Sequence, residues 1–169
     1  MDRPSTRRET VEGLSLGYLA IVLGLMVILP MATYAVERSL ATNVHDSWEM
    51  LFRWFIFWGI GVRLFVAGIR QIAQPSFTAR EIFHLSSPDA EVVVRELGFA
   101  NVCMGLAAAA AGFVASWRPC AAFTGGLYFG IAGVMHAIKR PATPNEWVAL
   151  TSDLFIFGIA GAYFVREVL

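Results

Sequence analysis

Residues 14–36 form a stretch of 23 residues without a charged side chain. A transmembrane helix requires such a run, because each helical residue rises about 1.5 Å and the hydrocarbon core of a bilayer is about 30 Å thick. The run is too long for the apolar region of a secretory signal peptide, and no clean Ala-x-Ala cleavage motif follows it. We therefore predict a first membrane-spanning helix, kinked at Pro30.

Four more apolar stretches follow, and 57% of the 169 residues are hydrophobic. A soluble domain of this size is less apolar, so the composition indicates a membrane protein. We predict an all-α fold, an integral membrane bundle of five transmembrane helices in a single membrane domain covering residues 1–169. The expected spans are about 14–36, 47–72, 92–117, 120–138 and 144–165.

Local signals set the ends of these helices. Asp46 and Glu49 are spaced as a capping box before the second helix. Ser87 precedes Pro88, which favours a helix that begins at the proline. The segment Thr143–Glu146 combines a capping box with a proline at the first helical position, so we expect the last helix to begin there.

The distribution of Lys and Arg predicts the orientation of the bundle. Positive charges in short flanking segments favour the cytoplasmic side. Eight of these residues flank the spans on the side of the N-terminus and four on the other side, so we expect a cytoplasmic N-terminus. The eight are Arg3, Arg7, Arg8, Arg70, Arg80, Arg95, Lys139 and Arg140, and the four are Arg38, Arg53, Arg118 and Arg166.

Composition and motifs exclude several functions. The formal net charge is zero, so no nucleic-acid partner is implied. No phosphate-binding loop, dinucleotide fingerprint or nucleophile elbow occurs. Cys103 and Cys120 are far apart in the expected hairpin and are predicted to be packing residues without a disulfide. We expect no catalytic residue, no metal and no cofactor, and therefore a protein that is not an enzyme.

Glycines are spaced to pack the helices. Gly98, Gly105 and Gly112 recur every seven residues in the third span, and small residues in such stripes let helix backbones approach closely in lipid. The fourth span carries Gly126 and Gly130 in a Gly-x-x-x-Gly pattern. This pattern fits packing inside the bundle, and it would equally fit the seam of a homodimer.

Polar side chains from four spans are predicted to gather near the cytoplasmic side. At about 1.5 Å per residue, Arg63 lies about 10 Å, Asn101 about 9 Å and Asp153 about 13 Å inside their helix ends. His136 lies one turn inside its span, and Glu96 lies at the rim, about 140° around the helix from Asn101. Because polar groups in hydrocarbon need partners, we expect Arg63 and Asp153 to face each other.

This cluster has two interpretations. In the first, Arg63 and Asp153 are a structural ion pair, with Asn101 satisfying the remaining hydrogen bonds. In the second, Arg63, Asn101, His136, Asp153 and Glu96 bind the polar head of an amphipathic molecule. Aromatic side chains would then form the walls around its tail, and the candidates are Trp58, Phe65, Phe99, Tyr128 and Phe157.

Four stretches of the sequence resemble a family of small bacterial membrane proteins whose function is unknown. The stretches are FWGIGVRLF at 57–65, RELGFAN at 95–101, GGLYFG at 125–130 with His136, and NEW at 145–147 with SDLF at 152–155. The architecture is also loosely similar to that of DoxX-like proteins, some of which associate with quinone-linked redox systems. Fold does not carry function, so neither resemblance supplies catalytic residues. Both imply a five-span protein, which we expect in the bacterial inner membrane.

Three functions remain open from the sequence. The first is a non-enzymatic module that binds a lipid, quinone or other amphipathic small molecule at the polar cluster. The second is a proton-linked transporter or ion pathway, because histidine changes its charge near neutral pH and His136 is close to Asp153 in depth. The third is a structural or accessory subunit of a larger membrane complex, or a homo-oligomer.

Overall fold

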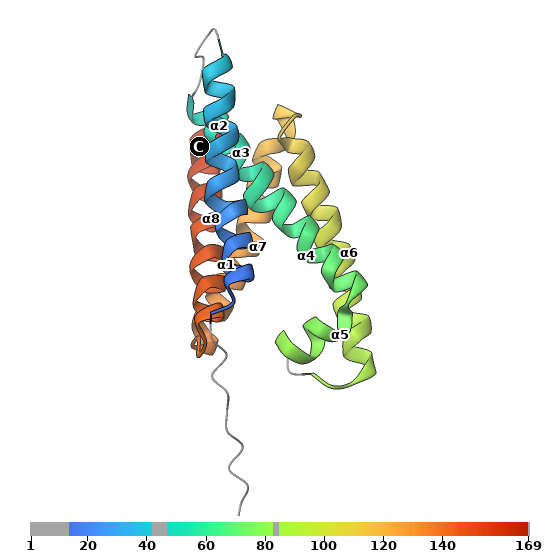
Figure 1. Ribbon diagram of the computed structural model, residues 1–169. Coiled ribbons are helices and arrows are strands. Elements are labelled where there is room, and N and C mark those ends of the chain that lie inside the picture. Colours follow the sequence, from blue (N-terminus) through green and yellow to red (C-terminus); the bar gives the residue numbers. More distant parts are fainter. Residues whose placement is uncertain (1–13, 42–46, 83–84, 169) are drawn as a thin grey trace, which may run out of the picture.

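The computed structural model describes residues 14–41, 47–82 and 85–168, and every regular element in these ranges is helical (Figure 1). Within them, five helical stretches are long and apolar enough to cross a membrane. These stretches are Leu16–Leu40, Ser47–Ala73, Pro88–Ala111, Ala115–Lys139 and Pro144–Glu167. The predicted all-α architecture with five long apolar helices is therefore confirmed.

The first two long helices each contain a π-helical segment. The first consists of α1 (Leu16–Leu23), the π segment η1 (Gly24–Ile28) and α2 (Leu29–Leu40). The second consists of α3 (Ser47–Phe55), the π segment η2 (Ile56–Val62) and α4 (Arg63–Ala73). Pro30 is the second residue of α2, and it has no N–H for an ordinary helical bond. We attribute the wider turn of η1 to this missing donor.

The remaining elements complete the chain. A short connection holds α5 (Pro75–Phe77) and the π segment η3 (Thr78–Ile82). The helix α6 (Pro88–Ala111) then leads through the 3-10 turn η4 (Ala115–Trp117) to α7 (Arg118–Lys139), and α8 (Pro144–Val168) ends the described chain. We name the two ends of the molecule the Leu40 end, uppermost in Figure 1, and the Pro144 end, which lies below it.

The helices form two groups that meet near the Leu40 end and diverge toward the Pro144 end (Figure 1). One group contains α1, α2, α7 and α8, in which α7 and α8 pack extensively on each other. The other is the hairpin of α4 and α6, and its connection through α5 lies away from the first group. The segment η2 crosses between them, since it contacts α6, α7 and α8.

Two helices have bounds that differ from those of the predicted spans. The first helix was expected to end near residue 36, but it continues through Glu37 and Arg38 to Leu40, because charged residues bound a membrane span without ending a helix. The third was expected at 92–117, but it runs from Pro88 to Ala111. Its start is set by Ser87, whose hydroxyl accepts a bond from the Ala90 amide at 3.2 Å, as predicted.

A buried arginine stabilises the C-terminal end of α6, which lies earlier in the sequence than predicted. Arg118, at the start of α7, donates from Nε to the carbonyl of Ala111 at 2.9 Å and also pairs with Glu49 on α3. It thus supplies a donor to a carbonyl that has no partner in its own helix. The sequence indicated Arg118 only as a charge that flanks a span, so this role was not predicted.

The glycine stripes pack the helices within one chain. A Cβ on Gly105 would lie 2.5 Å from the Phe65 amide nitrogen, and one on Gly68 would lie 2.6 Å from the Gly98 carbonyl oxygen, so α4 and α6 pack backbone to backbone. Gly126 faces Ala160 and Gly130 faces Phe157, both on α8. The alternative use of Gly126 and Gly130 as a homodimer seam is therefore wrong, because α8 already covers them.

Candidate functional site

Arg63 and Asp153 form a direct ion pair between α4 and α8. Arg63 Nη2 donates to Asp153 Oδ1 at 2.6 Å and to the Ser152 hydroxyl at 3.0 Å. Both charged side chains are mostly buried, with exposed fractions of 15% and 7%. The expectation that these two residues face each other is confirmed, and the contact needs no bridging group.

The π-helical segments η1 and η2 place the arginine. Arg63 is the residue that directly follows η2, and η2 packs against η1. Met26 in η1 provides a sulfur 3.5 Å from Arg63 Nη1, and the guanidinium lies 4.5 Å from the centroid of the Phe129 ring. The sulfur is a weak acceptor for Nη1 and the ring attracts the cation, so both neighbours stabilise the charge. π-helical segments are rare and occur often at functional sites.

His136 connects the buried pair to the surroundings. Its Nε2 lies 3.8 Å from Asp153 Oδ2, the carboxylate oxygen that Arg63 does not use. The His136 side chain is 36% exposed, whereas Asp153 is almost fully buried. This histidine is therefore the part of the cluster that a molecule outside the bundle reaches first.

Asn101 lies on α6, in the other group of helices, and is only 1% exposed. Its amide donates to Gln71 Oε1 on α4 at 2.8 Å, which joins the two helices of the hairpin. Its carbonyl oxygen Oδ1 is buried and has no hydrogen-bond partner among the described residues. Tyr128 on α7 interacts with Asn101 and lies close enough to Arg63 and Asp153 to interact with both charges. Tyr128 therefore links Asn101 to the ion pair.

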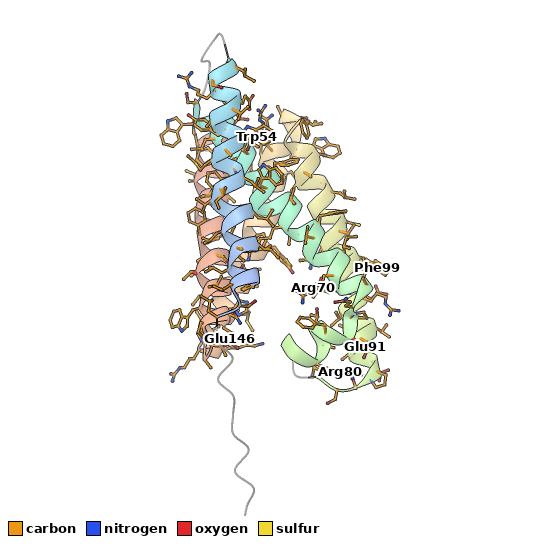
Figure 2. The ribbon with its side chains drawn as sticks, viewed as in Figure 1. Trp54, Arg70, Arg80, Glu91, Phe99 and Glu146 are labelled. Carbon is orange, nitrogen blue, oxygen red and sulfur yellow. The ribbon has the colours of Figure 1, made fainter. Side chains whose placement is uncertain are left out.

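Glu96 does not belong to this cluster. It is exposed on α6, and it makes no ion pair or hydrogen bond with other residues that the structure describes. Its angular offset from Asn101 places it on a different face of the helix, so the structure does not bring it together with the other predicted site residues. The candidate wall Phe99 also lies on the outer side of α6 (Figure 2), with 48% of its surface exposed.

The structure adds residues that the sequence did not reveal. Gln71, Ser152, Met26 and Phe129 all contact the predicted residues, and Tyr18 on α1 interacts electrostatically with Arg63 and Asp153. Ser152 is adjacent to Asp153, and Gln71 is an uncharged polar residue near the end of its span. The positions of Ser152 and Gln71 could therefore have been recognised from the sequence. Met26 and Phe129 could not, because they are indistinguishable from core residues.

The arrangement suits binding or proton exchange better than covalent chemistry. The charges of Arg63 and Asp153 cancel, so the centre of the bundle holds no net charge. Near the pair are an exposed imidazole, a tyrosine hydroxyl and an unpartnered amide oxygen, which belong to His136, Tyr128 and Asn101. These groups accept or donate hydrogen bonds, and no activated nucleophile stands among them.

Comparison with known proteins places the chain in a family but supplies no function. Residues 17–166 match the model of a family of unknown function (DUF6790). This match covers most of the chain, so the protein belongs to that family. No curated protein and no solved structure matches the sequence.

Proposed function

We propose that this protein is a non-enzymatic membrane module that binds a lipid, quinone or other amphipathic small molecule. The head group would lie between Asn101 on one wall and His136 with Asp153 on the other, toward the Pro144 end. The apolar tail would lie against aromatic side chains such as Phe65 and Tyr128. The proposal includes a cytoplasmic N-terminus, which puts this site on the cytoplasmic side, and the bacterial inner membrane as location.

The observation that supports this proposal is the Asn101 carbonyl oxygen. A buried acceptor without a partner is destabilising by about 1–3 kcal/mol, so a chain that retains one has a use for it or fills it with a bound group. A head group with a hydroxyl or amine, such as that of a lipid or a reduced quinone, would supply the missing donor. The nearby His136 and Tyr128 would add hydrogen bonds that fix its orientation.

The test is to identify what copurifies with the full chain. The protein is purified in mild detergent, and bound molecules are extracted and identified by mass spectrometry. We expect an amphipathic molecule in the native protein that is depleted in Asn101→Ala. The matched control is Cys103→Ala on the same helix, where the thiol is exposed and free. Equal amounts in all three proteins would contradict the proposal.

Proton-linked transport is a second proposal, and the contact between His136 and Asp153 supports it. A carboxylate that is buried beside a half-exposed imidazole can exchange a proton with the outside through that imidazole. The measurement is proton flux in liposomes that carry the purified protein and a pH-sensitive dye. A flux that disappears in His136→Gln is expected, and the absence of flux above empty liposomes would end this proposal.

An accessory role in a larger complex is a third proposal. Gly158 and Gly161 on α8 have open space beside them, so no helix that the structure describes packs on them. A partner helix could pack on this surface. Copurification with another membrane protein at fixed stoichiometry would support this role, and a monomer that is stable alone at native membrane concentrations would contradict it.

A further inference from the structure

A groove of about 490 Å³ lies near the Leu40 end, away from the cluster around Arg63. This volume is within the range of small-molecule sites, about 300–1,000 Å³. One wall is α2, and another is the start of the second long helix at Arg53 and Trp54. Phe113, in the turn after α6, also lines the groove. Figure 2 shows Trp54 near the Leu40 end, opposite Glu146 at the Pro144 end.

The walls of the groove are apolar. They are formed by Ala32, Thr33, Val36, Leu40 and Phe113. The Thr33 hydroxyl donates to the carbonyls of its own helix, at 2.7 Å to Leu29 and 3.1 Å to Pro30, so it offers no polar group to a ligand. Leu40 and Phe113 are each more than 70% exposed, which fits a groove that opens sideways toward hydrocarbon.

The polar end of the groove is a pair of opposite charges held by a tryptophan. Arg53 Nη2 pairs with Glu37 Oε2, and the same oxygen accepts the Trp54 indole N–H at 2.7 Å. The guanidinium also lies over the Trp54 ring, 4.7 Å from its centroid. Two donors therefore fix one carboxylate oxygen, and the geometry of the pair is set before any ligand arrives.

Part of this pair is accessible from the groove. Arg53 Nε is itself buried, but the Arg53 side chain as a whole is 22% exposed. Both of the Glu37 bonds just described end on Oε2, and the Glu37 side chain is 32% exposed. The groove thus presents part of a guanidinium and part of a carboxylate side by side.

The orientation of the groove matches that of a phospholipid in a membrane. Glu37 is three residues, about 4.5 Å, from the end of α2 at Leu40, whereas Ala32 lies five residues, about 7.5 Å, deeper. The charged pair therefore lies nearer to the end of the helix, and so to water, than the walls at Ala32 and Thr33 do. A phospholipid has the same order along its length, with its head at the interface and its chains below.

We infer that this groove binds a zwitterionic phospholipid with an ammonium head group, such as phosphatidylethanolamine. The phosphate would accept a hydrogen bond from the exposed part of the Arg53 guanidinium, and the ammonium would donate to the Glu37 carboxylate. A head group that carries both charges leaves the Arg53–Glu37 pair balanced, whereas an anionic head group would leave an extra negative charge beside Glu37. A choline head group has no N–H to donate. This site is independent of the proposed site at Asn101.

The test compares three lipids with the same acyl chains by native mass spectrometry of the full-length protein in detergent. These are phosphatidylethanolamine, phosphatidylcholine and phosphatidylglycerol. We expect at least a tenfold lower apparent Kd for phosphatidylethanolamine than for the other two. Ala32→Trp would fill the groove without changing a charge, and we expect it to remove the preference.

The matched control is Ala35→Trp, which adds the same side chain to an exposed position of α2 outside the groove. It should keep the preference for phosphatidylethanolamine. Equal affinity for the three lipids would overturn the inference, and so would a preference that survives Ala32→Trp. Tighter binding of phosphatidylglycerol would show an anionic-lipid site instead, which also overturns it.

Discussion

Two buried arginines in this bundle are neutralised in different ways. Arg63 lies within a long helix, and its oxygen partners are the Asp153 carboxylate and the Ser152 hydroxyl, both on α8. Arg118 lies at the start of a helix, where it pairs with Glu49 and also donates to the backbone carbonyls of Ala111 and Gly112.

The difference lies in how the bonds are distributed. Around Arg118, backbone carbonyls at a helix end share the charge with a carboxylate that is 28% exposed. Around Arg63, the backbone is occupied by helical bonds, and one carboxylate that is 7% exposed provides the only opposite charge described there. The charge of Arg63 is therefore neutralised by Asp153 alone, whereas that of Arg118 is stabilised by backbone carbonyls as well as by a carboxylate.

The largest effect is expected from Asp153→Asn. The change leaves Arg63 buried without its counter-charge, and breaking a buried pair in this way typically lowers the free energy of unfolding by ~3–5 kcal/mol. Titration with SDS in mixed micelles measures this loss. Glu96→Gln serves as the control, because Glu96 is exposed and unpaired in the described chain. Equal stability of the two variants would show that Asp153 does not stabilise the buried Arg63.

A smaller effect is expected from Gly105→Ala. The new methyl group would lie 2.5 Å from the Phe65 nitrogen and 2.8 Å from the Gly61 oxygen, on either side of Arg63 in sequence. The helices must separate, so we expect a loss of about 1–3 kcal/mol in the free energy of unfolding. Gly158→Ala, where nothing lies within 4 Å, should be neutral. A neutral Gly105→Ala would mean that α6 does not fix the position of Arg63.

Glu49→Gln tests the other side of the comparison. Arg118 retains its bonds to the carbonyls of Ala111 and Gly112, and Glu49 is partly exposed, so we expect a loss of only about 1 kcal/mol. The same SDS titration measures it. A loss as large as that of Asp153→Asn would remove the distinction between the two sites.

The smallest effect is expected from Arg80→Gln. Arg80 pairs with Glu91 at 3.1 Å, but its side chain is 61% exposed. Exposed pairs contribute about 0–1 kcal/mol, so the stability should change by less than 1 kcal/mol. This variant sets the baseline for an ion pair in contact with solvent, and a larger loss would mean that the connection through α5 contributes to the bundle more than its exposure suggests.

The architecture and the central pair were predictable because both depend on regular repeats. Five apolar runs gave the number of helices, and counting residues along them put Arg63 and Asp153 at similar depth. Once an arginine and an aspartate share a depth in hydrocarbon, their pairing follows from the high free energy of leaving either one alone. The same counting found Asn101 but could not reveal that Gln71, on the adjacent helix, is its partner.

The features that the sequence did not predict depend on where helices end and on which face is covered. Arg118 and Glu37 were assigned to flanking segments, because charge marks the limit of a span while the helix itself continues or begins elsewhere. The π-helical segments η1 and η2 within the first two long helices were also missed, and each of them shifts the face of the residues that follow it. Glu96 was included for its depth alone, although its face of α6 is exposed.

The most direct test of the central claim is a double-mutant cycle on Arg63 and Asp153. The variants are Arg63→Met, Asp153→Leu and the double replacement, and SDS titration gives the free energy of unfolding of each. If the two residues pair directly, each single change costs about 3–5 kcal/mol, and the double replacement recovers most of that loss because no charge is left buried. If the double variant loses the sum of the two single effects, the residues do not interact, and this account of the bundle is wrong.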